Sequence, residues 1–496
     1  MSRPLKWTLF LLGGVSLILL ALYLYVRLTI GAVNFTFGEE PLDPARFSQH
    51  VEVPEGMNIS VWADGIPNAR YLKFTPDGRL LVANPNLGQI LILTDTDGDG
   101  RADQREVLMT DLNGPNGMDF RGDQLYIAET DAIGRVSYDA ASGAVTGSYE
   151  RLVTGLPQGE NHWKKTLRFG PDGLLYVTMG SSCNVCKEAD GRRAAMVTYD
   201  PEGGNETIFA LGLRNSAGFD WSPTDGQIYA TDNGRDGLGD DYPPCELNQV
   251  QAGKHYGWPF VNGDNRPDPD FGDDPDAGSL SFTPPVHDFR AHNAPLGITF
   301  LRSESWPSAY RYSAVVALHG SWNRSEKDGY KVVSLHWRED GSIEERDLVT
   351  GFLNDGEVSG RPAEVTEGPD GALYISDDFA GAVYRVAPGE QQAFSAPAAA
   401  TVASGVTDGK ADIAELPAAT RERLQMEGAA LVSSLGCAEC HGDEPGKVLL
   451  TGLANRYNVE SMITYMAAPT PPMPRYDLSE VQRRAIAVQL LSQDGL

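Results

Sequence analysis

Residues 169–180 read FGPDGLLYVTMG, a tight turn followed at once by an apolar run. Pro presets φ for the turn and Gly accepts a positive φ, so Pro-Asp-Gly is a strong turn signal. The apolar run after it is typical of an interior β-strand. The same phrase recurs in FTPDGRLLVAN (74–84), FRGDQLYIAET (120–130), WSPTDGQIYATDNG (221–234) and EGPDGALYISDD (367–378), with a degenerate copy in YRYSAVVALHGSWN (310–323).

The spacing of these copies suits a β-propeller. They lie about 45 to 60 residues apart, apart from one longer gap between 234 and 310, and a four-stranded propeller blade has a similar period. Six copies predict a mainly β chain with a six-bladed β-propeller over residues 50–388. A β-sandwich whose turns recur by coincidence is the alternative. We expect the long gap to hold loops over one face, where ligands bind.

Composition agrees with a folded chain of two or three domains. Of 496 residues, 41% are hydrophobic and 22% are charged, which excludes simple disorder. The 54 glycines and 32 prolines suit many tight turns. A net charge of −28 would repel phosphate backbones, so nucleic acid is excluded as a partner.

The N-terminal region predicts a membrane anchor. Residues 7–26 carry no charge, and a run of about 20 apolar residues is long enough to cross a bilayer as a helix. Arg3 and Lys6 precede it, which favours a cytoplasmic N-terminus with the rest of the chain in the periplasm. The run is longer than the apolar core of a signal peptide, about 7–15 residues, so an uncleaved anchor within residues 1–30 is expected. A cleaved signal peptide is the alternative.

A C-x-x-C-H motif stands near the other end of the chain. Cys437 and Cys440 have the spacing for covalent attachment to the vinyl groups of a c-type haem, and His441 for binding the iron. Met473, in a Pro-Pro-Met-Pro loop, offers a thioether as the second axial ligand, which suits electron transfer. The motif therefore predicts a small all-α cytochrome c domain over residues 420–496.

The surroundings of this motif support haem over zinc. A zinc site would need further Cys or His ligands nearby, and residues 420–496 contain none beyond the motif. Met462 and Met466 lie four residues apart in a helical stretch, so they are expected in the core rather than on the iron. The preceding segment 391–419 is rich in Ala, Pro, Ser and Thr and is predicted to be a linker.

Three segments resemble the glucose/sorbosone dehydrogenase family. They are ENHWKKTLRFGPDGLLYVTMGS (160–181), LGLRNSAGFDWSP (211–223) and DNGRDGLGDDYPPCELNQVQAGKHYGWP (232–259). Members of that family are exported propellers that bind pyrroloquinoline quinone (PQQ) and Ca²⁺ and oxidise aldoses. The resemblance covers roughly residues 55–388. A fused cytochrome c domain is similar to membrane-associated sugar dehydrogenases and to pyranose dehydrogenases with haem domains.

The resemblance implies a catalytic pair. His162 stands eight residues before Gly170, at the position of the family's catalytic histidine. A neutral imidazole there would accept the proton of the substrate hydroxyl while hydride leaves for the quinone. Arg214 matches the arginine placed against the quinone oxygen, where a fixed cation stabilises developing charge. The family's aspartate that orients the histidine is Ser181 here, so the base must be oriented otherwise.

The resemblance also implies a calcium site. The backbone carbonyls of Gly234 and Arg235 match the ligands of the catalytic Ca²⁺. Because Ca²⁺ takes six to eight oxygen ligands and PQQ supplies several, a protein site made largely of carbonyls is sufficient. Asp240, Asp241 and Glu246 are candidates to support this loop.

Basic residues are implied for the carboxylates of PQQ. Arg361 matches a residue that pairs with them, since a bidentate fork suits a carboxylate. A second basic residue of that segment is replaced by Ala363. Arg324 and Lys331 are further candidates for this trianionic cofactor. Two more residues are candidates to line the sugar pocket: His292 and Trp322.

Two of the three remaining cysteines form a second C-x-x-C, without a following histidine. In an oxidising compartment Cys183 and Cys186 are expected to form a small disulfide that stiffens a loop beside the active-site face. A thioredoxin-like redox pair is the alternative, although no βαβ context surrounds it. Cys245 is left single and is predicted to be a buried thiol.

An acidic loop predicts a second calcium site. Asp95, Asp97, Asp99 and Glu106 fit the D-x-D-x-D-G-x₅-E pattern of a calcium-binding loop. Strands rather than helices flank it, so a paired EF-hand is excluded. An acidic hairpin tip without a metal is the alternative.

Together these features predict a membrane-anchored periplasmic dehydrogenase. It would oxidise an aldose or related hydroxyaldehyde to a lactone or acid, with electrons passing from PQQ to the haem. The respiratory acceptor beyond the haem would be a quinone, a second cytochrome or an oxidase. A calcium-dependent lactonase-type propeller and a non-catalytic binding propeller are the alternatives. A hydrolase has no use for an electron carrier, which favours the dehydrogenase.

The first testable prediction concerns haem ligation. Met473→Ala should lower the haem reduction potential and change the ferrous spectrum, because the variant lacks the thioether ligand. Met462→Ala and Met466→Ala are the matched controls and should leave both properties unchanged. The measurement is a potentiometric titration followed by visible absorbance. An unchanged potential in the Met473 variant would show that another residue is the axial ligand.

Overall fold

The computed structural model describes part of the chain. The described residues are 34, 40–159, 161–390, 413, 418–435, 437, 441, 453–455, 457–467, 476, 478 and 480–493. The predicted anchor at residues 7–26 lies outside them, as does most of the predicted linker. No helix among the described residues is long and apolar enough to cross a membrane.

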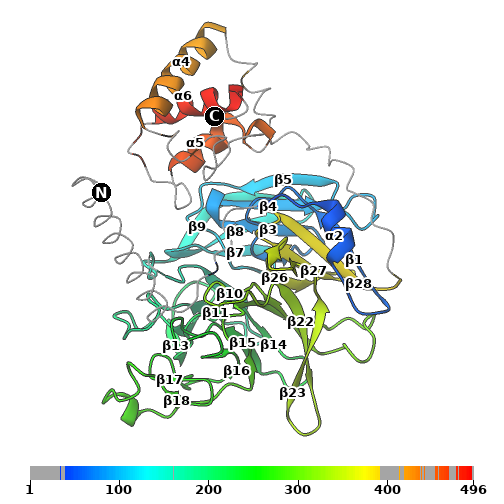
Figure 1. Cartoon of the computed structure of the whole chain (residues 1–496), viewed down its shortest axis with the longest axis vertical. Coiled ribbons are helices and arrows are strands. Elements are labelled where there is room, and N and C mark those ends of the chain that lie inside the picture. Colours follow the sequence, from blue (N-terminus) through cyan, green and yellow to red (C-terminus); the bar gives the residue numbers. More distant parts are fainter. Residues whose placement is uncertain are drawn as a thin grey trace, which may run out of the picture.

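Six four-stranded antiparallel sheets follow one another in the described residues between Met57 and Pro388 (Figure 1). In chain order their strands are β2 (Leu72–Phe74), β3 (Leu80–Asn84), β4 (Gln89–Thr94), β5 (Gln104–Met109); β6 (Met118–Arg121), β7 (Gln124–Ala128), β8 (Ala132–Asp139), β9 (Ala144–Thr154); β10 (Lys165–Phe169), β11 (Leu175–Met179), β12 (Ala195–Tyr199), β13 (Thr207–Leu211); β14 (Phe219–Trp221), β15 (Ile228–Asp232), β16 (Cys245–Val250), β19 (His287–Phe289); β20 (Pro295–Phe300), β21 (Ala314–Leu318), β22 (Lys331–Trp337), β23 (Ile343–Val349); and β26 (Pro362–Glu367), β27 (Leu373–Asp377), β28 (Ala382–Pro388), β1 (Met57–Ala63). This architecture confirms the predicted mainly β, six-bladed propeller.

Smaller elements decorate the propeller, and helices make up the described C-terminal part. Their bounds are α2 (Pro44–His50), η1 (Pro85–Leu87), β17 (Val261–Asn262), β18 (Arg266–Pro267), η2 (Ala277–Ser279), β24 (Leu353–Asn354), β25 (Glu357–Val358), α4 (Ala418–Ser434), η4 (Leu453–Asn455), α5 (Val459–Ala467) and α6 (Glu480–Gln493). The long gap between repeats holds β17, β18 and η2, which follow β16 as an insertion before β19 closes the fourth blade.

The repeated apolar run forms the second strand of every blade. First strands of neighbouring blades, such as β2 and β6, contact one another near the axis, so the second strand is interior to its sheet. In β3, Leu80 and Val82 pack toward the sixth blade, whereas Leu81 and Ala83 pack toward the second. Both faces of each sheet are therefore covered, which explains why these strands are continuously apolar rather than alternating.

The turn of the repeat is tied to its own strand. Tyr176 Oη donates a hydrogen bond of 2.9 Å to the Asp172 carboxylate four residues earlier. Tyr229 makes the equivalent 2.9 Å bond to Asp225. Each bond fixes the turn against the strand that follows it, and Gly173 supplies the positive φ of +79° that the turn requires.

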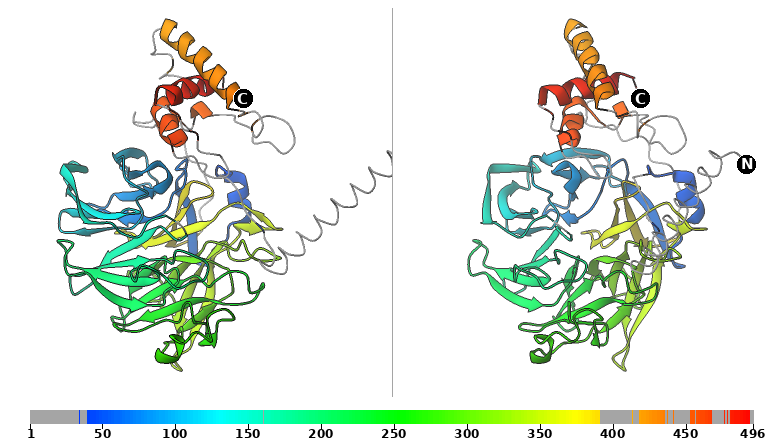
Figure 2. Two further views of the ribbon diagram at one scale, coloured as in Figure 1. Left: turned by 90° about the vertical axis from the view of Figure 1, so that its left-hand side faces the viewer. Right: turned by 60° about the vertical axis from the view of Figure 1, so that its left-hand side comes forward.

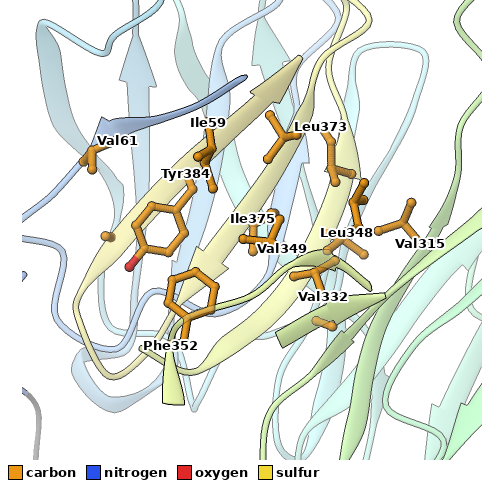
Figure 3. Close-up of a cluster of buried hydrophobic side chains, with 14 of the residues drawn as sticks. Ile59, Val61, Val315, Val332, Leu348, Val349, Phe352, Leu373, Ile375 and Tyr384 are labelled. Atoms are coloured by element: carbon orange, nitrogen blue, oxygen red, sulfur yellow. The ribbon is translucent and has the colours of Figure 1, made fainter. Parts of the chain in front are cut away.

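The ring closes by joining distant parts of the chain. β1 pairs antiparallel with β28, so a strand from before the first blade completes the last one. Figure 3 shows the apolar cluster between the fifth and sixth blades, where Ile59 and Val61 of β1 lie beside Tyr384 of β28. α2 covers this seam, because Phe47 stacks on Tyr384 with ring centroids 5.1 Å apart.

The C-terminal helices have a hydrophobic cluster of their own. Met462 and Met466 are buried in it, at 3% and 6% exposure, as predicted for core side chains. Cys437 packs partly against the same cluster. In two further views the helices stand beside the first blade (Figure 2), and α5 contacts η1 in the loop between β3 and β4.

Closure of the ring predicts a specific loss of stability. Ile59→Ala should lower the free energy of unfolding by about 2–5 kcal/mol, because it leaves a cavity in the buried seam. Val107→Ala, in exposed β5, is the matched control and should change stability by about 0.5 kcal/mol or less. Urea denaturation followed by fluorescence measures both. Equal effects of the two substitutions would contradict the role given to the β1 seam.

Candidate active site

A cavity of about 220 Å³ lies where the first strands of the blades meet. Every blade contributes to its wall, from its first strand or from the segment just before it. Arg70, His162, Lys164, Asn215 and Glu364 are among the lining residues. The cavity therefore gathers side chains that are far apart in sequence, as is typical of ligand sites.

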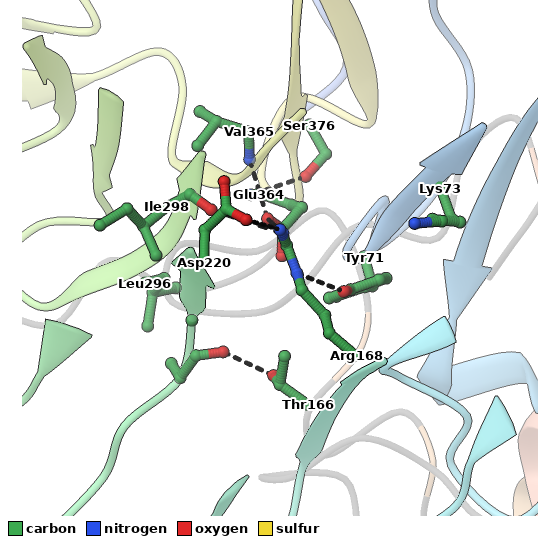
Figure 4. Close-up of polar contacts among 12 residues, drawn as sticks. Tyr71, Lys73, Thr166, Arg168, Asp220, Leu296, Ile298, Glu364, Val365 and Ser376 are labelled. Carbon is green, nitrogen blue, oxygen red and sulfur yellow. Dashed lines mark hydrogen bonds and ion pairs between the residues drawn. The ribbon is translucent and has the colours of Figure 1, made fainter. Parts of the chain in front are cut away.

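An ion-pair network lies among the first strands at the axis (Figure 4). The Arg168 guanidinium of β10 contacts the Asp220 carboxylate at 3.2 Å and the Glu364 carboxylate at 3.8 Å, and it donates to Tyr71 Oη at 3.3 Å. Arg302 contacts Asp220 at 2.9 Å. Burial raises the pKa of Glu364 to about 7, although Arg168 opposes the shift. Since Tyr71 and Glu364 also line the cavity, this network lies beneath one part of it.

His162 precedes β10 in an unusual backbone conformation. Its φ of +50° lies in the left-handed region, which costs free energy for a residue with a side chain. Gly180, just after β11, permits this position, because a Cβ at Gly180 would stand 2.5 Å from the His162 Cβ. The chain thus accepts local strain and a glycine to bring this imidazole to the cavity.

The hydrogen bonds around His162 determine its tautomer. Its Nδ1 lies 2.9 Å from Ser181 Oγ and 3.1 Å from the Ser181 carbonyl oxygen. Ser181 Oγ in turn donates its hydrogen to the carbonyl of Cys183 at 2.8 Å, because a carbonyl can only accept. Nδ1 must therefore carry the proton and donate it to Ser181. Nε2 is left with its lone pair, which is the state required of a general base.

Electrostatics keep this imidazole neutral. Burial and the nearby Arg214 guanidinium lower the pKa of His162 to about 3. Ser181 accordingly does the orienting that the resemblance assigned to an aspartate, but it adds no negative charge that would favour the imidazolium. The departure noted in the sequence leaves a neutral and oriented histidine.

Arg214 is buried beside this histidine and is held by carbonyl oxygens. Its Nε and Nη2 donate to the backbone and side-chain oxygens of Asn184, each at 2.9 Å. Its Nη1 donates to the carbonyls of Asn233 at 2.9 Å and Gly234 at 3.0 Å. The nearest carboxylate in an ion pair with it is that of Asp236, at 3.7 Å. Arg214 is therefore a rigid, weakly neutralised cation.

A second group of cations lies at the same end of the axis. Arg70 and His319 both hydrogen bond to the buried Asp378, and Arg361 Nη2 donates to His319 Nδ1 at 2.9 Å. Burial and Arg361 lower the pKa of His319 to about 4, so it is neutral and donates from Nε2 to Asp378. Lys164 is close enough for burial and Arg70 to lower its pKa to about 7.

This cation group carries an excess of positive charge. Against the buried charge of Asp378 stand the guanidinium groups of Arg70 and Arg361, with Lys164 as a third cation when protonated. Although burial alone would raise it, His319 and Arg70 hold the pKa of Asp378 well below its ordinary value. Arg361 Nε is buried with no hydrogen-bond partner among the described residues. The group is suited to a small polyanion.

Two of the predicted anion-binding residues are committed elsewhere in the structure. Arg324 is buried, donates to the Asp240 carbonyl and contacts the Asp241 carboxylate at 3.2 Å, so it fixes that loop. Lys331 contacts the Asp347 carboxylate across β22 and β23 at 2.5 Å. Arg361 alone of the three predicted residues belongs to the cation group.

The predicted calcium ligands lie directly beside Arg214. The Gly234 carbonyl accepts a hydrogen bond from it, and the Arg235 side chain points into contacts of 2.8 and 2.9 Å with Asp268 and Asp270. Among the described residues, the groups of three Asp, Glu, His or Cys side chains that could hold a metal ion lie away from Gly234 and Arg235. A Ca²⁺ here would therefore rely on carbonyl oxygens and on the ligand that shares it.

The sequence predicted Glu246 as a support of the calcium loop and His292 and Trp322 as lining of the sugar pocket. Glu246 accepts from Gly263 N at 3.0 Å and lies opposite Asp232 on β15. His292 is buried and contacts the Gly239 carbonyl at 2.8 Å, whereas Trp322 is 37% exposed. Neither of the latter two lines the cavity described above.

The acidic loop at residues 95–99 gathers three of its four predicted ligands. Carboxylate oxygens of Asp95, Asp97 and Asp99 all lie within 4.8 Å of one another. Glu106 is not in this group, because it sits in β5 opposite Ile92 of β4. The second calcium site stays a prediction.

The structure confirms both predictions for the cysteines of the propeller. Cys183 and Cys186 form a disulfide in the loop between β11 and β12. Cys245 is a buried free thiol, and burial raises its pKa to about 11. Of the haem residues, the backbone N of His441 donates to the Cys437 carbonyl at 3.0 Å. Cys440 and Met473 lie outside the described residues.

Four residues of the site escaped the sequence analysis: Arg70, Lys164, His319 and Asp378. Their local sequences carry no ligand motif, and their contacts join blades that are distant along the chain. The sequence could have indicated two of them only by their position after a repeated strand, because His319 directly follows β21 and Asp378 directly follows β27. These ends correspond to the end of β11 that leads to Ser181, so in a propeller they meet at one face.

Two known family profiles match parts of this propeller. The Glucose / Sorbosone dehydrogenase family profile matches residues 188–385, and the TrAA12-like profile matches residues 51–259. The propeller is related to the glucose/sorbosone dehydrogenase family. The matches confirm that part of the resemblance and do not extend to the predicted cytochrome c domain.

Individual relatives agree with this placement. An uncharacterised protein of Borreliella burgdorferi is 29% identical over 68% of this chain and 90% of its own length. An aldose sugar dehydrogenase of Escherichia coli is 24% identical over 51% of this chain and 67% of its own length. Quinoprotein glucose dehydrogenase B of Acinetobacter calcoaceticus is 22% identical over 46% of this chain and 57% of its own length.

Solved structures share the fold. A Trichoderma reesei enzyme of carbohydrate-active family AA12 aligns with a TM-score of 0.59 and 22% identity, covering 71% of this chain and 100% of that one. The PQQ domain of pyranose dehydrogenase from Coprinopsis cinerea, in its holo form, aligns with a TM-score of 0.58 and 21% identity over 71% of this chain and 98% of that one. At this identity the likeness establishes the propeller fold alone.

The cation group predicts a large effect of its carboxylate. Asp378→Asn should destabilise the protein by about 3–5 kcal/mol, because the buried guanidinium groups lose their counter-charge. The depressed pKa means that this contribution is present above about pH 4 and is lost as the pH falls from there toward the folded pKa of Asp378.

Asp347→Asn is the matched control for this substitution. It breaks the exposed pair with Lys331 and should cost about 0–1 kcal/mol. Denaturant unfolding at pH 7 and at pH 3 measures both variants. If Asp378→Asn were as mild as its control, the cation group would not depend on this carboxylate.

Proposed function

We propose that this protein oxidises an aldose or related hydroxyaldehyde to a lactone or acid, with PQQ as its bound electron acceptor. The observation that carries the proposal is the neutral His162, whose Nε2 lone pair is fixed beside a cavity on the propeller axis. Relatives that include a sugar dehydrogenase and a quinoprotein support oxidation of a sugar.

The residues present fit PQQ, a small planar quinone with three carboxylates. Arg70, Lys164 and Arg361 supply the positive charge that these carboxylates require, at the same end of the axis as His162. The unpartnered Nε of Arg361 is a hydrogen-bond donor available to such an anion. These three residues would hold PQQ, and the Gly234 and Arg235 carbonyls would hold the Ca²⁺ bound with it.

The protein's own residues supply the acid–base chemistry. His162 Nε2 accepts the proton of the substrate hydroxyl, while Nδ1–H keeps the ring oriented through Ser181. Burial and, second to it, Arg214 hold the imidazole neutral before the reaction, and Arg214 provides a fixed cation where negative charge develops. PQQ, when bound, supplies the hydride acceptor that no side chain provides.

We further propose that the electrons leave through haem c in the C-terminal helices, attached at Cys437 and Cys440, and pass to a respiratory acceptor in the periplasm. Residues 7–26 would anchor the protein in the inner membrane. The contact of α5 with η1 supports this route, because the β3–β4 loop is equivalent to the β11–β12 loop beside His162. The helices would thus sit on the face where sugar is oxidised.

Two variants test this proposal by separating rate from affinity. In protein loaded with PQQ and Ca²⁺, His162→Ala should reduce dye-linked sugar oxidation by roughly 10²–10⁴-fold, because the positioned base is lost. Its affinity for PQQ should change little. Arg361→Met should weaken PQQ binding, measured by fluorescence titration, and keep most of the turnover at saturating PQQ. Near-normal turnover of His162→Ala would refute the assignment of the base.

A further inference from the structure

The loop closed by the Cys183–Cys186 disulfide touches the supports of both predicted catalytic side chains. It connects β11 to β12 and emerges at the end of β11, beside His162. Four residues thus form a small covalent ring at the edge of the site. Its contacts go well beyond those of a loop that is merely stiffened.

One branch of contacts runs from this ring to the base. The Cys183 carbonyl takes the hydroxyl hydrogen of Ser181 at 2.8 Å, and this direction leaves Ser181 Oγ as the acceptor for His162 Nδ1–H at 2.9 Å. If the Cys183 carbonyl moved away, the Ser181 hydroxyl would be free to turn and donate to Nδ1. The Ser181 carbonyl, 3.1 Å from Nδ1, would still accept from the Nδ1–H tautomer, so the two tautomers would compete and part of the population would carry its proton on Nε2. The position of the ring therefore favours the Nδ1–H tautomer over the other.

A second branch runs from the ring to the arginine. Asn184 accepts two of the Arg214 N–H groups, one on its backbone oxygen and one on Oδ1, both at 2.9 Å. The same Oδ1 accepts from Asp236 N at 2.8 Å, and Nδ2 donates to the Asp236 carbonyl at 2.9 Å. The amide of Asn184 is thus fixed by the neighbouring loop and holds the guanidinium away from the Asp236 carboxylate, at 3.7 Å.

Both sets of contacts affect His162, one through its tautomer and the other through its pKa. Burial lowers the pKa of the imidazole most, Arg214 and Arg193 lower it further, and Asp236 raises it. Loss of the Asn184 side chain would leave the Nε and Nη1 bonds of Arg214 in place but would free Nη2, which could then approach the Asp236 carboxylate from its present 3.7 Å. The arginine would then do less to disfavour the imidazolium. The position of the disulfide ring is therefore coupled to both the tautomer and the protonation state of His162.

We propose that the Cys183–Cys186 ring is the positioning element of this site, with the Cys183 carbonyl setting the tautomer of His162 and Asn184 setting the place of Arg214. Neither residue touches the reacting atoms, so both act through the residues they hold. The description of His162 as a base rests on the proposed function. The geometry of the ring and its effect on the imidazole do not.

The test measures the imidazole directly and needs neither sugar nor PQQ. Nitrogen-15 NMR of the full-length protein reports the protonation of each ring nitrogen, and His162→Gln identifies the His162 signals by their loss. In the wild type, His162 should carry its proton on Nδ1 and should not titrate between pH 5 and pH 8. Asn184→Ala should raise the pKa of His162 above its wild-type value, seen in a titration extended below pH 5, and Cys183→Ala/Cys186→Ala should add the second tautomer.

A matched control distinguishes this effect from general damage. Asn205→Ala removes an exposed asparagine that hydrogen bonds to Asp200 in a hairpin turn, so His162 should behave as in the wild type. A wild-type His162 that titrates near its ordinary pKa would overturn the proposal. So would an Asn184→Ala variant whose His162 has the wild-type pKa, or a Cys183→Ala/Cys186→Ala variant that keeps a single tautomer. Failure of the sugar-oxidation assay alone would count against the proposed activity and leave these outcomes intact.

Discussion

Pairing of β1 with β28 is the interaction on which the rest of this structure depends. Each blade has two apolar faces, and both are buried only if the ring is closed, since an open ring would expose two of them. Closure brings the first strands of all six blades to one axis. The segments leading into those strands then surround a single cavity, which explains how residues from every blade form one site.

Charge is distributed unevenly between the surface and the axis. The chain as a whole carries a net charge of −28, yet Arg70 and Lys164 line the cavity. Arg361 lies next to them through His319, and Arg214 lies close enough to His162 to affect its pKa. Buried cations of this kind are costly unless they are paired or serve a ligand. Asp378 compensates part of the charge, and the excess favours a polyanion. Burial, with Arg214 as the second cause, keeps His162 neutral beside this group.

Local patterns in the sequence predicted local features of the structure. A turn followed by an apolar run, with Pro-Asp-Gly in three of the copies, identified the second strands of the blades, and the Cys183–Cys186 spacing identified a disulfide. The functional departure at Ser181 was visible too, but not its hydrogen bonds. Contacts across the axis were beyond reach, because a partner such as Asp378 is chosen by ring closure rather than by sequence spacing. Lys331 is the opposite case. The sequence suggested that it binds an anionic ligand, but in the structure it pairs with Asp347 on the neighbouring strand.

The central claim is that sugar oxidation on the propeller drives reduction of a haem on the same chain. Its most direct test is stopped-flow absorbance of full-length protein loaded with PQQ and Ca²⁺ and mixed with an aldose without any external acceptor. The account predicts that the ferrous haem bands appear within one turnover, at a rate independent of protein concentration, and only when PQQ is present. A haem that stays oxidised while an added dye is reduced, or one that sugar reduces without PQQ, would contradict it.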